Sequence, residues 1–349
     1  MKKFFLLMMA CGAALWGRAQ QGTDVLMATL QHGDEVSVYY GKTALEEAYT
    51  AAADSGDVVT LSAGVFSFSN HEFQKSLSVV GNGFVSDMEN GIYPTIIEDG
   101  LCFKPRDVVD DDGEMVKEGV KVDGIRLEGL KLSYVLFQSS GVIRDFQIVK
   151  CQLSGSERPL LFESSTENFV LRQSVCDGVQ FGAGNGCNHQ NFYVCGSYVA
   201  VIDFPKEYCT VNVDHSLINS LYQNELVGLS LGNSIVKASN ISSGVVANNC
   251  VFIDNTPYNL IGAGNWVNCK LAFEESMNDM AWDGVKTFKL KYPEEYVGTD
   301  GMQVGLYGGP YPYNPTPSIP QIKESHIDTT VAADGKLKVS VTIEAQTED

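Results

Sequence analysis

The residues best suited to acid–base chemistry are charged side chains that recur in the middle of the chain. Arg158 and Glu163 lie in one segment, and Asp203, Lys206 and Glu207 lie in a later one. A lysine or arginine can remove the α-proton of a uronate while carboxylates hold Ca²⁺ against it, which is polysaccharide-lyase chemistry. A glycoside hydrolase instead needs two carboxylates at a set separation. Solvated surface charge explains the same residues without any activity.

A second candidate is the dipeptide Asp214-His215, which loosely resembles a short signature of pectate lyases. No arginine follows Arg172, so an arginine base is missing from the C-terminal half, and Lys206 or Lys237 would have to replace it. The paired aspartates and the Gly-His-Gly element of polygalacturonase-like hydrolases are not found. Because short motifs often mislead and a polar turn explains the dipeptide fully, we favour the turn.

Metal-binding patterns are equally weak. The five histidines are dispersed, and neither histidine nor cysteine pairs have the spacing of metal ligands. Asp110-Asp111-Asp112-Gly113 resembles a calcium loop, but Val108 stands at the first ligand position and Gly119 at the closing one. We therefore expect no resident metal or other cofactor, and Ca²⁺ only if the protein is a lyase.

An internal repeat between residues 124 and 273 indicates the elements that must position these residues. The recurring pattern is apolar-x-apolar-x-x-(usually small)-x-apolar, and its central positions are 16 to 23 residues apart. The central residues are Leu130, Cys151, Ser174, Ser197, Ser216, Ser234, Cys250 and Cys269. Each half of the pattern alternates with period two, as a strand with one inward face does, and the break between halves fits a tight bend. Repeats of this kind stack as coils of a solenoid.

The bend predicts where individual side chains lie. Asn233, Asn249 and Asn268 directly precede central residues, and asparagine tolerates the left-handed backbone that a tight bend needs. The Ser and Cys side chains should then stack inside the tube. Cys151, Cys250 and Cys269 are therefore expected to be buried thiols, although nine cysteines in an exported chain would ordinarily suggest disulfides. The β-rich repeats exclude a helical solenoid, so we predict an all-β, right-handed parallel β-helix.

The start of the repeat region resembles a known family. Residues 41–54, GKTALEEAYTAAAD, have the pattern of an amphipathic helix, and strand-like segments follow at 56–68, GDVVTLSAGVFSF, and 75–84, KSLSVVGNGF. This opening resembles that of secreted bacterial pectin-lyase-like right-handed β-helix proteins, in which such a helix caps the first coil. Residues 288–309, FKLKYPEEYVGTDGMQVGLYGG, resemble their final coil. The resemblance covers most of residues 25–309 and implies a fold, with polysaccharides as the usual ligands or substrates.

The predicted body of the protein spans residues 20–309. A charged stretch at 106–120 is expected to project from it as a hairpin. Residues 310–349 begin with the Pro-rich run PYPYNPTPSIP, which is typical of an extended linker. They end in a predicted C-terminal β-hairpin around Asp334-Gly335.

The first residues and the overall charge indicate an exported, acidic protein. Residues 1–19 have a basic start, an apolar stretch and a small-x-small cleavage site, which predicts a signal peptide. A lipoprotein anchored through Cys11 is the alternative, but its lipobox is poor. Removing the three cations of the signal peptide changes the formal net charge from −19 to −22 (−19 − 3). We therefore expect a periplasmic, cell-surface or extracellular protein with no transmembrane segment and no nucleic-acid partner.

Two functions remain open at this point. The first is a non-catalytic, carbohydrate-binding protein that contacts glycan or other cell-envelope material, since the repeat is complete and no catalytic set is recognisable. Its acidic surface suits neutral glycans, or anionic glycans only through a bridging cation. The second is a polysaccharide lyase or glycoside hydrolase acting in a groove along the β-helix, where stacked coils would align Arg158, Glu163, Asp203 and Lys206.

Aromatic residues gather near the C-terminal end of the repeat region, at Trp282, Tyr307, Tyr311 and Tyr313. Rings with polar tips make good platforms for sugars. They also make good covers for the open end of an apolar tube, and we favour that interpretation because the tube must be closed to water.

Overall fold

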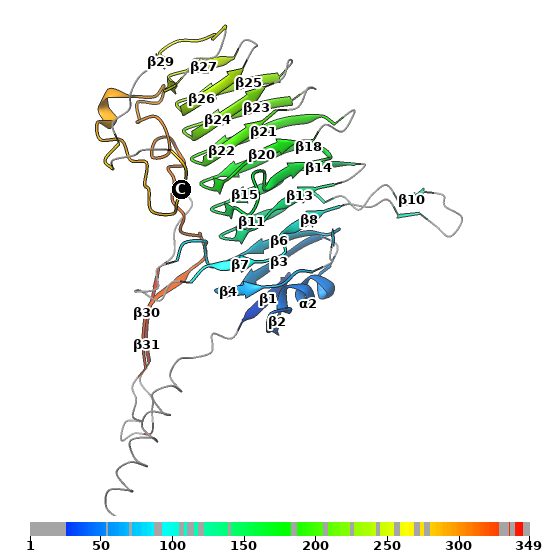
Figure 1. Cartoon of the computed structure of the whole chain (residues 1–349). Coiled ribbons are helices and arrows are strands. Elements are labelled where there is room, and N and C mark those ends of the chain that lie inside the picture. The colour runs from blue at the N-terminus through cyan, green and yellow to red at the C-terminus, as the bar shows by residue number, and fades with distance from the viewer. Residues whose placement is uncertain are drawn as a thin grey trace, which may run out of the picture.

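The chain folds into a β-solenoid of stacked parallel coils (Figure 1). The computed structural model describes residues 26–53, 55–69, 72–86, 93–104, 108–109, 115–117, 122–138, 141–182, 187–204, 209–223, 227–241, 245–254, 259–268, 273–275, 280–327, 335 and 339–344. The predicted signal peptide and the Asp110–Asp112 run lie outside these residues. No helix in the described part of the chain is long and apolar enough to cross a membrane. The predicted all-β, parallel β-helix is confirmed as the fold class.

One sheet, sheet A, receives strands from successive coils along the length of the solenoid. Its strands are hydrogen-bonded in the order β2-β1-β3-β6-β11-β15-β18-β21-β23-β25-β27, and β14 also pairs with β18. Neighbouring strands from β3 onward are parallel. The bounds are β1 Met27–His32, β2 Glu35–Tyr40, β3 Ser55–Leu61, β6 Ser76–Val80, β11 Arg126–Glu128, β14 Val142–Arg144, β15 Gln147–Val149, β18 Ser165–Arg172, β21 His189–Cys195, β23 Cys209–Asp214, β25 Val227–Gly232 and β27 Val246–Asn248.

The remaining strands of each coil form sheet B, which begins as two ribbons. The first ribbon contains β4 Gly64–Phe66, β7 Thr95–Ile97, β12 Lys131–Leu132, β16 Gln152–Leu153 and β19 Val175–Cys176. The second contains β5 Glu72–Phe73, β8 Leu101–Phe103, β13 Val135–Phe137, β17 Leu160–Phe162 and β20 Val179–Phe181. The ribbons merge at β22, because it pairs with both β19 and β20. The merged sheet continues through β22 Tyr198–Asp203, β24 Leu217–Gln223, β26 Ile235–Ile241, β28 Val251–Phe252 and β29 Trp266–Val267.

A bend with left-handed backbone leads from sheet A into sheet B in successive coils. The positive-φ residues at this bend, called the corner residues below, are Gly129, Lys150, Gln173, Gly196, His215, Asn233, Asn249 and Gly264. The residue after each corner from Gly129 to Asn249 is fully buried, and several of these are serines. The backbone N–H of Ser174 donates to Ser197 Oγ at 3.1 Å, that of Ser197 to Ser216 Oγ at 3.3 Å, and that of Ser216 to Ser234 Oγ at 3.1 Å. The predicted serine stack is confirmed, and so is the predicted corner conformation at Asn233 and Asn249. Asn268 also has a positive φ, but it follows β29 of sheet B, so the last predicted repeat is out of register, and Cys269 lies outside the described residues.

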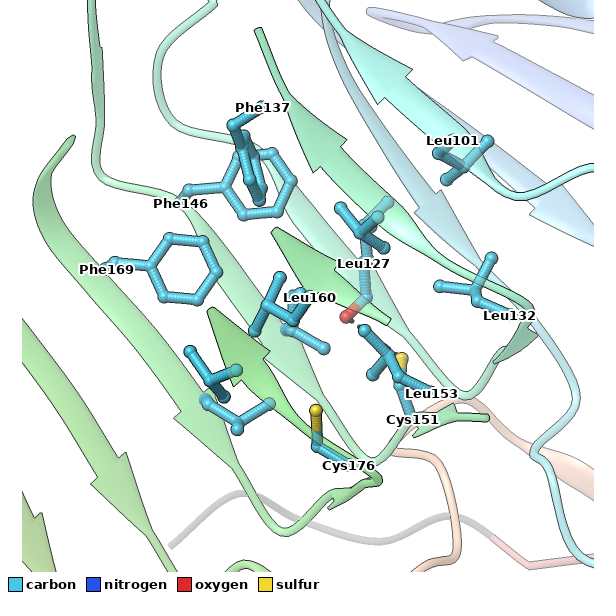
Figure 2. Close-up of a cluster of buried hydrophobic side chains, with 14 of the residues drawn as sticks. Leu101, Leu127, Leu132, Phe137, Phe146, Cys151, Leu153, Leu160, Phe169 and Cys176 are labelled. Atoms are coloured by element: carbon cyan, nitrogen blue, oxygen red, sulfur yellow. Dashed lines mark hydrogen bonds between the residues drawn. The ribbon is translucent and has the colours of Figure 1, made fainter. Parts of the chain in front are cut away.

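The interior of the tube is filled by aliphatic and aromatic side chains. Phe146, Phe169 and Phe192 occupy the same place in successive coils, with ring planes within 1° of parallel and centroids 5.4 and 4.9 Å apart. Figure 2 shows two of these rings, Phe146 and Phe169, in the same cluster as the thiols of Cys151 and Cys176, with Leu127 and Leu160 between them. All the cysteines that the structure describes are free, and burial raises the pKa of these two thiols to about 12. The prediction of buried thiols in place of bridges is thus confirmed for the described bends.

The N-terminal end of the tube is closed by helix α2, Ala44–Ala51, which lies within the predicted range. Its apolar side, including Leu45 and Ala48, is fully buried. Lys75 Nζ donates to the carbonyl oxygens of Tyr49 and Ala52 at 2.9 and 2.6 Å. These carbonyl groups at the C-terminal end of the helix thereby gain a hydrogen-bond donor that the helix itself does not provide. The antiparallel strands β1 and β2 precede the helix and extend sheet A beyond the first coil. Sequence analysis did not predict these two strands.

A C-terminal segment, residues 280–318, covers part of the outer face of sheet B, and we call it the strap. It contains a short 3-10 helix, η1 Pro293–Glu295. Its apolar side chains bury a column of outward-facing ones, Val175, Tyr198, Leu217, Ile235 and Val251, under Met280, Phe288, Leu290, Val304 and Leu306. Residues 288–309 therefore run along the side of the coils, and the expectation that they form a final coil is wrong. The reason is that these outward strand positions are apolar and need a cover.

The Pro-rich stretch at 310–318, expected to be a linker, lies against the coils. Gln173 Nε2 donates to the carbonyl oxygen of Pro312 at 2.7 Å. The backbone N–H of Ser318 donates to Glu128 Oε1 at 2.7 Å, and its hydroxyl donates to the same oxygen. Burial alone would raise the pKa of Glu128, but the two bonds from Ser318 and a neighbouring arginine outweigh it and lower that pKa. The strap is therefore fixed to the solenoid at both apolar and polar points.

Two antiparallel strand pairs lie outside the solenoid proper, and Figure 1 shows both projecting from it. The first joins β9 Val108–Val109 to β10 Met115–Lys117, within the charged stretch expected to form a hairpin. The second joins β30 Gln321–Ile327 to β31 Val339–Glu344 at the C-terminal end. Both predicted hairpins are confirmed as antiparallel pairs.

Candidate functional site

The four residues predicted to line a groove do not all come together. Arg158 Nη2 lies 3.1 Å from Asp203 Oδ2, so these two residues form an ion pair between coils. Glu163 lies at the other end of β17, where its carboxylate accepts a hydrogen bond from Gln138 Nε2 at 2.9 Å. Lys206, the predicted base, lies outside the described residues. The structure thus pairs Arg158 with Asp203, whereas the hydrogen bond made by Glu163 is to Gln138.

The Asp214-His215 dipeptide forms a buried corner beneath the strap. His215 Nδ1 lies 3.0 Å from Asp214 Oδ2, and His215 Nε2 lies 3.2 Å from Asp300 Oδ2 of the strap. Gly308 and Gly309 lie so close to the ring that a Cβ at either position would clash with it. Because His215 is only 2% exposed, a polymeric substrate cannot reach its imidazole. The interpretation of this dipeptide as a turn is therefore correct, and the turn also helps to hold the strap.

The predicted aromatic cluster covers the side of the tube, so the expectation that it closes the open end is wrong. The Trp282 ring packs on Tyr198 of β22 and on Tyr313, with centroids 5.5 and 5.7 Å apart. The Arg172 guanidinium lies over the Tyr311 ring, 4.7 Å from its centroid. These rings hold the strap against sheet B and the adjoining corner, so they are used for packing.

The outer face of sheet A carries a hollow of about 380 Å³ at strands β21, β23 and β25. It is lined by Asn188, His189, Gln190, Asn191, Cys209, Thr210 and Gly228. Its exposed side chains are amides and a hydroxyl, and none carries a charge. Gly228 lies at an outward strand position and presents no side chain, which leaves room for the hollow. We call this feature the sheet A hollow.

A row of polar side chains leads along sheet A to this hollow. Asn191 Nδ2 donates to Asn168 Oδ1 at 3.0 Å, and Asn168 Nδ2 donates to Asp145 Oδ1 at 2.9 Å. All three residues have positive φ, so each marks the same kink in its own coil. The row ends at Thr210, whose Oγ1 accepts a hydrogen bond from the backbone N–H of Asn191 at 2.8 Å. The next coil is shorter, and the register between β21 and β23 shifts there.

The floor of the hollow is uncharged as well. His189 and Cys209 are buried beneath it, and His189 Nδ1 lies 3.1 Å from Thr166 Oγ1. Burial lowers the pKa of His189 to about 4 and raises the pKa of Cys209 to about 12. At neutral pH the imidazole is therefore a neutral ring and the thiol keeps its proton. The part of the lining that the structure describes presents only neutral donors and acceptors to a ligand.

Sequence analysis missed this hollow, although two signals for it were present. The spacing between repeat centres drops from 23 residues (Ser174 to Ser197) to 19 (Ser197 to Ser216), which indicates a change in coil shape. In addition, Gly228 stands where the preceding coil has the side chain of Thr210 on the outer face. In the described residues, no group of three or more His, Cys, Asp or Glu side chains could hold a metal ion.

Comparison of the chain with protein-family models, with curated proteins and with solved structures found no match in any of the three. The fold is therefore established by the strand pairing alone.

Proposed function

We propose that this chain is an exported β-helix protein, of the pectin-lyase-like type, that binds a neutral glycan or similar hydroxyl-rich cell-envelope material without cleaving it. The observation that carries the proposal is the uncharged sheet A hollow at the end of a row of amides. Amide side chains both donate and accept hydrogen bonds, so they suit sugar hydroxyls, which do the same. The predicted signal peptide and the family resemblance support export to the periplasm, the cell surface or the medium.

The charge distribution favours a neutral ligand. The mature chain would carry a formal charge of −22 (−19 − 3), and Asp145 lies at the end of the amide row that is farther from the hollow. A uronate chain would meet repulsion there unless a cation bridged the two. A neutral oligosaccharide meets no such repulsion and can use every donor and acceptor of the hollow.

The surroundings of the ionisable groups favour binding over cleavage. Among the described residues that line the hollow, there is no exposed carboxylate, lysine or arginine that could act as acid or base. On sheet B, Arg158 Nη2 and Asp203 Oδ2 lie 3.1 Å apart, so the two side chains neutralise each other in an ion pair. The polysaccharide-lyase or hydrolase alternative would therefore depend on residues such as Lys206, which lie outside the described part of the chain.

A glycan array tests the proposal with the chain from Gln20 onward, using neutral and uronate oligosaccharides side by side. The diagnostic variant is Gly228→Val, which fills the hollow. A Cβ at Gly228 would meet Thr210 Cγ2 at 3.4 Å and the Cys209 carbonyl oxygen at 3.5 Å, which are ordinary contacts, so the strand should keep its fold. The matched control is Ser230→Val, which adds the same kind of side chain to the outer face of the same strand but outside the hollow.

We expect the unsubstituted chain and Ser230→Val to bind the same neutral oligosaccharides. Gly228→Val should weaken that binding by about tenfold or more, because the valine side chain would fill the space that the sugar needs. Equal binding by both variants would reject the hollow as the site. Release of unsaturated uronides, assayed with Ca²⁺ across alkaline pH, would reject the non-catalytic function, above all if Lys206→Ala abolished it.

A further inference from the structure

Strand β2 is the edge strand at the N-terminal end of sheet A, and none of the described strands pairs with its outer side. Within the described residues it pairs only with β1, in the register Met27↔Tyr40, Thr29↔Val38 and Gln31↔Val36. The backbone N–H of Gly41 donates to the Leu26 carbonyl oxygen at 2.8 Å, and hydrogen-bonded pairs alternate along an antiparallel ladder. The N–H and C=O groups of the next residue, Tyr40, therefore point away from β1, and those of Val38 and Val36 do as well.

The side chains on one face of this edge are apolar and exposed. Val36 is 61% exposed, Val38 42% and Tyr40 62%, and Met27 of the neighbouring strand is exposed beside them. Natural proteins usually protect such an edge with charge, proline or a covering segment, because it otherwise pairs with another strand. Here the edge offers both free backbone groups and apolar side chains, so it is suited to receive a strand.

The sequence around β2 is suited to antiparallel pairing with a second copy of the same strand. Counting outward from Val38, the residues two positions away are Val36 and Tyr40, and those four positions away are Asp34 and Lys42. All five are on the exposed side of the strand or its flanking turns. In an antiparallel pair of two such strands centred on Val38, each Val36 would face a Tyr40. The flanking Asp34 of one copy would lie at the same end as Lys42 of the other, and Lys42 Nζ is also 2.6 Å from Glu98 Oε2 in its own chain. Opposite charges would then meet at both ends of the pair.

From this geometry we propose that two copies of the chain associate through antiparallel pairing of their β2 strands, with a two-fold axis at Val38. The backbone N–H and C=O groups of Val38 point away from β1. In this pair they would point toward Val38 of the second copy, so the two residues could exchange hydrogen bonds. Three facing pairs would exchange about two hydrogen bonds each. Sheet A becomes continuous through the two N-terminal ends, and the interface is isologous, as in most symmetric dimers. A second copy is the occupant that this self-complementarity selects.

Cysteine cross-linking tests the register of the pair on the whole mature chain. Val38→Cys places two thiols at the two-fold axis, with Cα atoms about 5.5 Å apart, which is within the range of a disulfide. Val36→Cys is the matched control, on the same face of the same strand. Its two thiols would lie about 13 Å apart along the paired strands and cannot bond. The double variant Val36→Cys with Tyr40→Cys restores facing pairs.

Under mild oxidation, Val38→Cys and the double variant should form covalent dimers, while Val36→Cys and the unsubstituted chain should stay monomeric on a denaturing gel. Analytical ultracentrifugation of the unsubstituted chain should show a dimer. The variant Val38→Pro should weaken that dimer by about tenfold or more, since proline removes a donor that β1 does not use. A monomer at every concentration, or equal cross-linking by Val36→Cys and Val38→Cys, would overturn the proposal.

Discussion

The backbone N–H of Ser174 donates a hydrogen bond to the hydroxyl of Ser197, 3.1 Å away in the next coil. The Ser197 hydroxyl in turn lies 2.9 Å from the Cys195 carbonyl oxygen, to which it donates. Each serine of the stack thus links its own corner to the preceding coil. Both residues are fully buried, so these bonds are made away from water and their loss is costly.

Replacing Ser197 by alanine should lower the free energy of unfolding by about 1–3 kcal/mol, because the buried N–H of Ser174 loses its acceptor. Urea denaturation followed by circular dichroism measures this. Ser230→Ala, on the outer face of β25, is the control and should change stability by less than about 0.5 kcal/mol. Equal effects of the two substitutions would show that the serine stack contributes little.

The neutral imidazole of His189 should make stability depend on pH. Burial lowers its pKa in the folded chain to about 4, against 6.5 in the unfolded chain, so the unfolded chain binds the proton first as pH falls. The contribution of neutral His189 to the free energy of unfolding is fully present above pH 6.5. As pH falls from 6.5 to 4, the free energy of unfolding decreases by about 3 kcal/mol. His189→Phe, whose ring can pack on Phe162 and Phe181, should lose this part of the pH dependence. A variant with the same slope as the unsubstituted chain would contradict the assignment.

The strap should loosen when a single corner side chain is removed. Asn233 Oδ1 accepts a hydrogen bond from the Thr299 backbone N–H at 2.8 Å, and Asn233→Gly removes this acceptor while glycine keeps the positive φ of 48°. Limited proteolysis with mass spectrometry should show faster cleavage within the strap. Asn168→Gly makes the same change at a positive-φ residue outside the strap and should leave its cleavage rate unchanged. Faster cleavage in both variants would point to a general loss of stability instead.

The buried thiols should be inert in the folded chain. Burial raises the pKa of Cys151, Cys176 and Cys250 to about 12, so almost no thiolate is present at pH 8, and the thiols are also inaccessible. Alkylation with iodoacetamide should leave these three cysteines unmodified until urea unfolds the protein. Peptide mapping identifies each site. Rapid alkylation of Cys151 in the native chain would contradict its burial.

The sequence predicted the coils well because each strand has one inward face and each bend needs a particular conformation. Asn233 and Asn249 were expected to be left-handed, and their φ angles are 48° and 49°. The strap was missed because its docking depends on the outward positions. Leu217 and Ile235, next to stacked serines, are apolar on the face that should be solvated, and this second apolar column was the available signal.

The candidate site was harder to predict, for physical reasons. Arg158 and Asp203 were expected to share a stripe, and they do pair, but the position of Glu163 depends on loop lengths that periodicity does not give. The sheet A hollow arises from an absent side chain at Gly228 and from a shortened coil. Both are visible in the sequence only after the register of neighbouring strands is known.

Hydrogen exchange of the chain from Gln20 onward, with and without a neutral oligosaccharide selected on the array, tests the proposed function most directly. The account predicts that bound sugar slows exchange in β21, β23 and β25, which line the sheet A hollow, and leaves β17 and β20 unchanged. Slower exchange confined to β17, β20 and β22, around Arg158 and Asp203, would contradict it and return the site to sheet B.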